Sequence, residues 1–237
     1  MTTATKIVNE VTLDASANPN VDTTFIDKGT NENTAHDIHG NSGKDTWVSG
    51  PGQNNFDGGD GIDTASYIHS QSGVTVDLNV GFAFSDDGKI TDNLSSVENV
   101  VGSKFADNLT GAFDGSHING GLGGDVMTGG EGGKNTFEYG NWHDSYNAPG
   151  HMDEITNFKG GPGGDVIDLS ALDKAMHIPT ASHNLMYGTA PTSVGDIGIT
   201  YDGTHTFVEE RVDGNALHDL RIELDGTVPI THDNFHF

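Results

Sequence analysis

The sequence of 237 residues lacks cysteine, has few basic residues and contains no long apolar run. Without cysteine, neither disulfides nor thiolate metal sites can stabilise the fold. The 10 lysines and arginines stand against 35 acidic residues and are too few to neutralise nucleic-acid phosphates, so we expect no nucleic-acid binding. No apolar segment is long enough to span a bilayer, so we expect no membrane insertion. The N-terminal segment also lacks the apolar core of a cleaved secretion signal.

Catalytic motifs are lacking as well. No H-E-x-x-H zinc motif occurs, and the nearest pair, His36 and His39, is spaced i, i+3 with no glutamate between. No G-x-S-x-G nucleophile motif occurs either. His143 beside Asp144, and His151 near Asp153, are candidates for a transition-metal site, although histidines in polar loops are usually plain surface residues. Carboxylate pairs for glycoside hydrolysis are too easily found among 35 acids to be informative.

Glycine and aspartate are what the sequence has in excess. There are 34 glycines, and 26 of the 35 acidic residues are aspartate, giving a formal net charge of −25. Short carboxylates favour turns and cation-binding loops, whereas helical surfaces favour glutamate. A solubilising acidic surface is the alternative interpretation. Such a charge also predicts that the metal-free chain repels itself and folds poorly.

Three nine-residue units fill residues 40–66: GNSGKDTWV, SGPGQNNFD and GGDGIDTAS. They follow the template G-G-x-G-x-D-x-U-x, where U is a large apolar residue, which is the calcium-binding repeat of parallel β-rolls. Each unit combines a glycine-rich turn with a short strand whose U residue points inward. Trp47, Phe56 and Ala65 occupy the U positions at intervals of nine.

A second block of units begins at residue 102, with U residues Leu109, Ile118 and Met127. Phe137 comes one residue late, and a one-residue insertion would put Asn135 in the aspartate slot in place of Lys134. Lys134 could itself replace a cation. A further unit, GGPGGDVID, occupies 160–168 and leads into a predicted short helix, LSALDKAM.

The spacing of the aspartates predicts where calcium binds. With two units per coil, turns 18 residues apart stack on the same side of the roll. Asp45 and Asp63 are 18 apart, as are Asp107 and Asp125, whereas Asn54 takes the corresponding place on the other side of the first block. Calcium needs six to eight oxygens with carboxylates among them. We therefore expect strong sites on one side of each block and weak or empty ones on the other, unless these aspartates merely cap turns.

These patterns predict an all-β fold: a parallel β-roll of calcium-binding nonapeptide repeats, followed by a C-terminal antiparallel β-meander or sandwich-like cap. We expect an N-terminal arm or cap over 1–30, the roll in two repeat blocks over 31–182, and the C-terminal β cap over 183–237.

Several segments together resemble one family, the repeats-in-toxin proteins, and specifically the C-terminal module of serralysin-type secreted metalloproteases. They are GGDGIDTAS, VGSKFADNLTG, GGLGGDVMTGGEGG, DEITNFKGG and DVIDLSALD, and the likeness runs from about residue 40 to the C-terminus. The final THDNFHF is similar to the family's uncleaved C-terminal type I secretion signal, although Asn234, His236 and Phe237 depart from its apolar run. The metalloprotease domain itself is missing.

The resemblance implies three calcium sites, each built from backbone carbonyls and carboxylates of two stacked turns. The first would take Asn41, Gly43 and Asp45 with Gly58, Asp60 and Asp63. The second would take Ser103, Phe105 and Asp107 with Gly120, Leu122 and Asp125. The third would take Gly130, Gly132 and Asn135, with Asp153 reaching in.

The resulting functional prediction is a secreted, extracellular or cell-surface calcium-binding protein without enzyme activity, which folds on export through a type I secretion apparatus. It would act as a structural, adhesive or self-assembling module, with self-association or a cell-surface polysaccharide as its partner. Trp142, Tyr139 and Tyr146 are candidates for stacking on sugars, whereas Trp47 is expected in the core. The alternative is the calcium-binding and secretion module of an extracellular hydrolase or polysaccharide-modifying enzyme. Met1 and the C-terminal segment favour a whole short protein.

Overall fold

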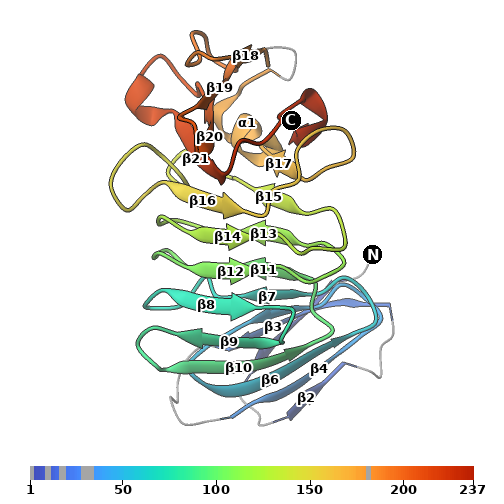
Figure 1. Cartoon of the computed structure of the whole chain (residues 1–237). Helices are drawn as coiled ribbons and strands as arrows, with labels where there is room; N and C mark the ends of the chain where they lie inside the picture. Colours follow the sequence, from blue (N-terminus) through green and yellow to red (C-terminus); the bar gives the residue numbers. More distant parts are fainter. Residues whose placement is uncertain (1–2, 9–11, 16–19, 28–34, 180–182) are drawn as a thin grey trace.

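The computed structural model describes the whole chain except residues 1–2, 9–11, 16–19, 28–34 and 180–182. The chain winds as a stack of coils between two long sheets, from the N-terminal strands at one end to a C-terminal cap at the other (Figure 1). The predicted fold class, a parallel β-roll with a C-terminal β cap, is confirmed.

One sheet has nine strands, and all its neighbours pair in parallel. In spatial order they are β1 (Thr3–Val8), β3 (Asp22–Asp27), β5 (Thr46–Val48), β7 (Thr64–Ser66), β11 (Asn99–Val101), β13 (His117–Asn119), β15 (Thr136–Glu138), β17 (Val166–Asp168) and β22 (Phe235–His236).

The other sheet has thirteen strands and is mixed. In spatial order they are β18 (Leu185–Tyr187), β19 (Ile197–Tyr201), β20 (His205–Glu210), β21 (Leu220–Asp225), β16 (Asp153–Thr156), β14 (Val126–Thr128), β12 (Asn108–Thr110), β8 (Val74–Asp77), β9 (Phe82–Ser85), β10 (Ile90–Ser95), β6 (Gly52–Gly59), β4 (Asp37–Asn41) and β2 (Thr12–Asp14). The predicted short helix is α1 (Ser170–Met176), and short 3₁₀ helices occupy 216–218 and 232–234. Among the described residues, no helix is both long and apolar enough to cross a membrane.

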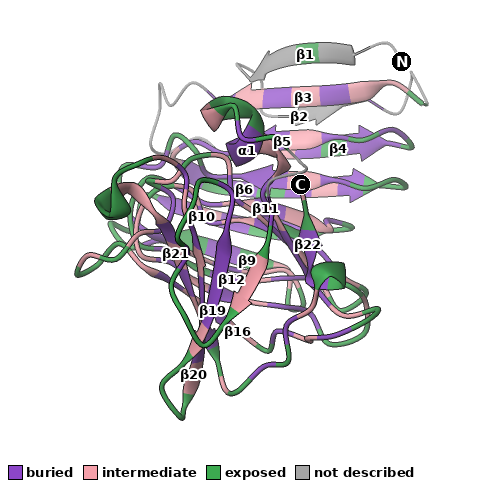
Figure 2. Ribbon diagram, turned by 90° about the horizontal axis from the view of Figure 1, so that it is seen from above, coloured by how far each residue is buried: buried purple, intermediate pink, exposed green. Residues whose placement is uncertain are grey.

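The core consists of two ladders of apolar side chains, one from each sheet. Buried residues recur along the strands of both sheets (Figure 2). Strands of only three residues point a single side chain inward, so successive coils stack one apolar residue on the next. The nine-stranded sheet aligns Phe25, Trp47, Ala65, Val100, Ile118, Phe137, Ile167 and Phe235. The other sheet aligns Ile38, Phe56 and Leu94, and then Val76, Leu109, Met127, Ile155 and Leu224. Every predicted U residue is at most 1% exposed, which confirms the register of both blocks.

An inserted hairpin separates the two repeat blocks. Strand β9 pairs antiparallel with both β8 and β10, so the chain makes three passes through the thirteen-stranded sheet between Ser66 and Asn99. After three passes the chain leaves this sheet on the same side as it would after one, and beyond the hairpin the aspartates stand in the turns on the opposite side of the roll.

Both ends of the chain extend the two sheets. Strands β1 and β2 are terminal strands of the two sheets, so part of the predicted N-terminal arm completes the roll. At the other end β19, β20 and β21 form an antiparallel meander, and β21 and β22 continue the two sheets in parallel beside β16 and β17. The predicted boundaries at 30/31 and 182/183 lie outside the described residues.

Candidate calcium sites

The first predicted site joins the turn after β4 to the turn after β6. The backbone N–H of Asp45 donates to Oδ1 of Asp63 (2.7 Å), so the two aspartates predicted to stack do so. The carbonyl oxygens of the upper turn lie close to the backbone of the lower turn. The oxygen of Gly43 is so near Gly61, whose φ is +140°, that a Cβ on Gly61 would lie 2.0 Å from it. The carbonyl of Asn41 faces the lower turn at Gly59 in the same way.

The carboxylates of this first site are buried, and one of their oxygens lacks a hydrogen-bond partner. Asp45 accepts hydrogen bonds from the N–H groups of Thr23 (2.8 Å) and Asn41 (2.6 Å). Oδ2 of Asp63 is buried with no hydrogen-bond partner. Burial, reinforced by the charges of Asp45 and Glu98, raises the pKa of Asp63 to about 7. A divalent cation beside these oxygens would remove the cost of burying them as carboxylates.

The second predicted site repeats this arrangement around Asp107 and Asp125. The N–H of Asp107 donates to Oδ1 of Asp125 (2.8 Å). The carbonyls of Ser103 and Phe105 face the following turn, where a Cβ on Gly121 would lie 2.1 Å from the oxygen of Ser103. The side chain of Phe105 is exposed, so its predicted contribution is limited to its carbonyl.

This second column of carboxylates continues one coil further than predicted. The N–H of Asp125 donates to Oδ1 of Asp153 (2.9 Å), and Oδ2 of each aspartate is buried without a partner. Burial raises the pKa of Asp107 to about 6 and that of Asp125 to about 8, and it raises the pKa of Asp153 well above its usual range. Three stacked carboxylates therefore line this edge.

The two columns lie on opposite edges of the roll. Asp45 and Asp63 stand where the chain passes from the thirteen-stranded sheet to the nine-stranded sheet. Asp107, Asp125 and Asp153 stand where it passes back. We call these the Asp63 edge and the Asp125 edge. Each repeat block thus presents its aspartates to a different side.

Comparison with known proteins agrees with this architecture. The sequence model of the peptidase M10 serralysin C-terminal family matches residues 28–235. The chain belongs to this family. None of the curated proteins matches it in sequence.

Two solved structures similar to this serralysin C-terminal module are subunits of a mannuronan C5-epimerase from Azotobacter vinelandii. The AlgE6R3 subunit is 28% identical, with 58% of this chain and 71% of that chain covered and a TM-score of 0.41. The AlgE6R2 subunit is 26% identical, with 60% of this chain and 81% of that chain covered and a TM-score of 0.40.

The remaining predicted carbonyl donors of the serralysin module fall into two groups. The carbonyls of Gly58 and Gly120 lie between stacked turns, 2.1 and 2.3 Å from where a Cβ on Gly40 and Gly102 would stand. Asp60 and Leu122 lie at exposed turn tips, so their side chains point to solvent.

The third predicted site is not brought together. Asn135 is buried in the aspartate slot, as the one-residue insertion predicts, but it lies on the Asp63 edge. Its N–H and its side-chain amide both donate to Oδ1 of Asp165, at 2.8 and 3.1 Å. Asp153 lies instead on the Asp125 edge, because the loop after β15 crosses back to the thirteen-stranded sheet before reaching it. The grouping of Gly130, Gly132 and Asn135 with Asp153 is therefore corrected.

A lysine occupies the turn at Gly130. Nζ of Lys159 donates to the carbonyls of Gly130 (3.0 Å), Glu131 (2.6 Å) and Gly133 (3.3 Å). Lys134, the predicted substitute for a cation, is exposed. The ammonium group that takes the place of a cation among these carbonyls therefore belongs to Lys159, which comes from the neighbouring coil.

The place opposite the first site, predicted to be weak or empty, is filled by side chains. Oδ1 of Asn54 lies 2.9 Å from Nδ1 of His36, and Nδ2 of Asn54 donates to Oδ1 of Asp92 (2.8 Å). Asp92 belongs to the inserted hairpin and is fully buried. This network satisfies the Asn54 amide without a calcium ion.

The described residues of the loop at 141–159 take part in no group of three possible metal ligands. Asp144 accepts from the N–H groups of Gly140 and Asn141, each at 2.8 Å, and so closes its own turn. Tyr139 is 1% exposed, so it cannot stack on an external sugar. Trp142 is half-buried and stacks on His143 with ring centroids 3.5 Å apart. As predicted, Trp47 belongs to the core.

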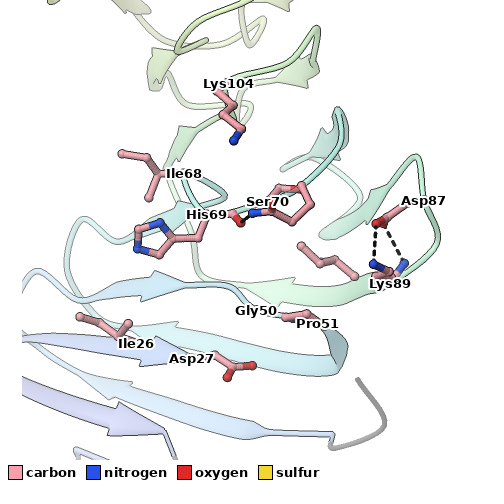
Figure 3. A pocket seen from close by; sticks show the side chains of 12 residues that line it. Ile26, Asp27, Gly50, Pro51, Ile68, His69, Ser70, Asp87, Lys89 and Lys104 are labelled. Atoms are coloured by element: carbon pink, nitrogen blue, oxygen red, sulfur yellow. Dashed lines mark hydrogen bonds and ion pairs between the residues drawn. The ribbon is translucent and has the colours of Figure 1, made fainter. Parts of the chain in front are cut away.

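A groove of about 830 Å³ opens beside the inserted hairpin (Figure 3). Ile68, His69, Lys89 and Lys104 are among its lining residues. Among the described residues that line it, none is a predicted calcium ligand. Gly50, Ile68 and Lys104 all stand where the chain passes from the nine-stranded to the thirteen-stranded sheet, so the groove lies along the Asp125 edge.

The sequence patterns did not predict one cluster of possible metal ligands. Asp173, His183 and Glu210 meet in the interior of the C-terminal part, with one possible ligand atom from each residue lying within 4.8 Å of the others. Ten and 27 residues separate them along the chain, and no local motif relates those positions. Only the tertiary fold brings them together.

Proposed function

We propose that this chain is a secreted calcium-binding module, without enzyme activity of its own, that folds when it meets calcium outside the cell. The observation that carries the proposal is the pair of aspartate columns. In them Oδ2 of Asp63, Asp125 and Asp153 is buried without a partner beside carbonyls of the stacked turns.

The coupling of calcium to folding follows from charge. A chain with a net charge of −25 repels itself, and burying these carboxylates without a cation opposes the compact state. Calcium that binds the folded chain alone stabilises it by mass action, about 2.7 kcal/mol per site at a concentration about a hundred times Kd. A few sites would decide whether this lean core folds. The chain would pass a type I secretion apparatus unfolded in low calcium and fold outside.

The proposed role outside the cell is structural or adhesive, with self-association or attachment to a surface polysaccharide. A second candidate is the calcium-binding and secretion module of an extracellular hydrolase or polysaccharide-modifying enzyme. The family description favours this candidate, because it names the C-terminal part of a peptidase.

Calcium titration followed by circular dichroism tests the folding step. We expect β signal to rise on calcium addition and to fall with a chelator. The matched variants are D63N, which changes a buried carboxylate, and D60N, which changes an exposed one. No gain of β signal in the wild-type chain would refute calcium-coupled folding.

The role is tested on calcium-loaded protein. Electron microscopy and binding to cell surfaces and glycans should detect assembly or attachment. A protein that stays monodisperse and binds neither would contradict the structural and adhesive role. Protease and lyase assays on the same sample would favour the second candidate if they were positive.

A further inference from the structure

Asp173, His183 and Glu210 form a buried cluster far from both aspartate columns. Asp173 lies on α1, His183 precedes β18, and Glu210 is the last residue of β20. Their side chains are 6%, 1% and 0% exposed. Three ionisable groups are thus withdrawn from water at the junction of α1 with the C-terminal meander.

One nitrogen of the cluster lies close to three carboxylate oxygens. Nε2 of His183 lies 3.2 Å from each carboxylate oxygen of Asp173 and 3.3 Å from Oε1 of Glu210. A single N–H directed at three oxygens can align well with only one of them. These separations match the edge of a tetrahedral zinc site, about 3.3 Å when the bonds to nitrogen and oxygen are about 2.0–2.1 Å.

The charge of the cluster also favours a cation. Both carboxylate oxygens of Glu210 and Oδ2 of Asp173 are buried, and Nε2 of His183 approaches Oε1 and Oδ2 without a well-aligned hydrogen bond. Among the described residues, the ion pairs of both carboxylates are made with His183 alone.

We propose that Asp173, His183 and Glu210 bind one zinc-type transition-metal ion. An imidazole nitrogen with two carboxylates suits such metals, whereas calcium takes six to eight oxygens. The ring of Phe237 stacks on His183 with centroids 3.8 Å apart and covers it. The ion would therefore act structurally, joining α1 to the meander beneath the C-terminal segment.

Cobalt(II) is a suitable probe because its visible absorption reports tetrahedral coordination. The full chain is first saturated with calcium so that the aspartate columns are filled, and is then titrated with cobalt(II). We expect a tetrahedral d–d band that saturates at one ion per chain and is displaced by zinc(II). Zinc(II) should also raise the Tm of the calcium-loaded protein.

Three variants make the assignment specific. H183A and E210Q should lose the band and the zinc-dependent shift in Tm, whereas H117A, which removes an exposed histidine, should keep both. Circular dichroism in calcium checks that each variant folds, and E210Q keeps the size of the side chain if H183A does not fold. A wild-type chain with neither the band nor the shift would overturn the proposal and leave His183 simply in contact with two carboxylates. The same band in a folded H183A or E210Q variant would overturn it too.

Discussion

At the scale of single residues, the position of each aspartate in its turn decides its role. Asp63 and Asp125 direct carboxylates between stacked turns, whereas Asp60, three positions before Asp63, points to solvent. A count of residue types does not distinguish the buried aspartates from the exposed ones. They differ in burial: Asp63, the sixth residue of its repeat, is buried, whereas Asp60, the third residue, is exposed.

The variant D63N should weaken calcium binding at the first site by roughly tenfold or more, about 1.4 kcal/mol, because it removes a charged ligand. D60N is the matched control and should bind as the wild type does, since only its carbonyl is a predicted ligand. Isothermal titration calorimetry measures both. Equal affinities for D63N and D60N would count against the predicted first site.

The raised pKa values of the aspartate columns predict an unusual pH dependence for the metal-free fold. The pKa of Asp63 is about 7 and that of Asp125 about 8, both above the ordinary value of 3.8. The folded chain then holds protons that the unfolded chain has lost, so this contribution is fully present below about pH 4 and is lost as the pH rises through 7 to 8. With a chelator present, the β signal in circular dichroism should therefore be larger at about pH 5 than at about pH 8.

Calcium should reverse this trend, because it binds the deprotonated carboxylates and releases their protons. Proton uptake or release on calcium addition can be followed in weakly buffered solution near neutral pH. A chelated protein that is more stable at the higher pH would contradict the burial of protonated carboxyls.

Lys159 acts as a built-in cation, and its removal should destabilise the calcium-loaded protein. K159M leaves three backbone carbonyls without their donor, which costs about 1–3 kcal/mol. K134M, at an exposed position, should stay within about 0.5 kcal/mol of the wild type. Urea unfolding in saturating calcium measures both, and a K159M protein as stable as K134M would refute this role.

At the scale of the structural element, the glycine turn is the unit that places the carbonyls. G61A should destabilise the protein by at least about 2 kcal/mol, because φ is +140° there and the new Cβ would meet the Gly43 oxygen at 2.0 Å. It should also weaken the first calcium site. G214A is the control, because no atom lies within 4 Å of its Cβ position. Thermal unfolding with and without calcium separates the two effects, and similar losses in both variants would contradict the turn's role.

The same elements explain how much the sequence could predict. The nine-residue period predicted every core residue of both repeat blocks, because each three-residue strand has one inward position and the coil imposes its spacing. The period also predicted the stacking of Asp45 on Asp63 and of Asp107 on Asp125, since each pair lies within uninterrupted repeats.

Where the repeats are interrupted, the 18-residue spacing no longer predicts which turns stack on one another. The loop after β15 returns Asp153 to the Asp125 edge, and beyond the hairpin of β8, β9 and β10 the aspartates stand in the turns of the opposite edge from Asp45 and Asp63. Lys159 reaches its carbonyls from another coil. These placements depend on the path of loops, for which the sequence offers no period.

At the scale of the whole molecule, the roll is a stack in which each coil pairs with its neighbours along two continuous sheets (Figure 1). Stability in such stacks is approximately a sum of coil and neighbour contributions. The first aspartate column lies among the early coils and the second among the later ones, with the inserted hairpin between them. The loss of calcium at one column should therefore loosen its own part of the molecule first.

The double variant D45N/D63N in saturating calcium should lose amide protection in β4, β5, β6 and β7, while β14 to β17 stay protected. The variant D107N/D125N should show the converse pattern, since its column runs from the turn before β12 to Asp153 at the start of β16. Hydrogen exchange read by mass spectrometry measures both variants, with the wild-type chain in calcium as the reference. Loss of protection throughout the chain in both variants would mean that the two columns act as one cooperative unit. Separate losses would mean that the inserted hairpin divides the roll into two parts, each stabilised by calcium on its own edge.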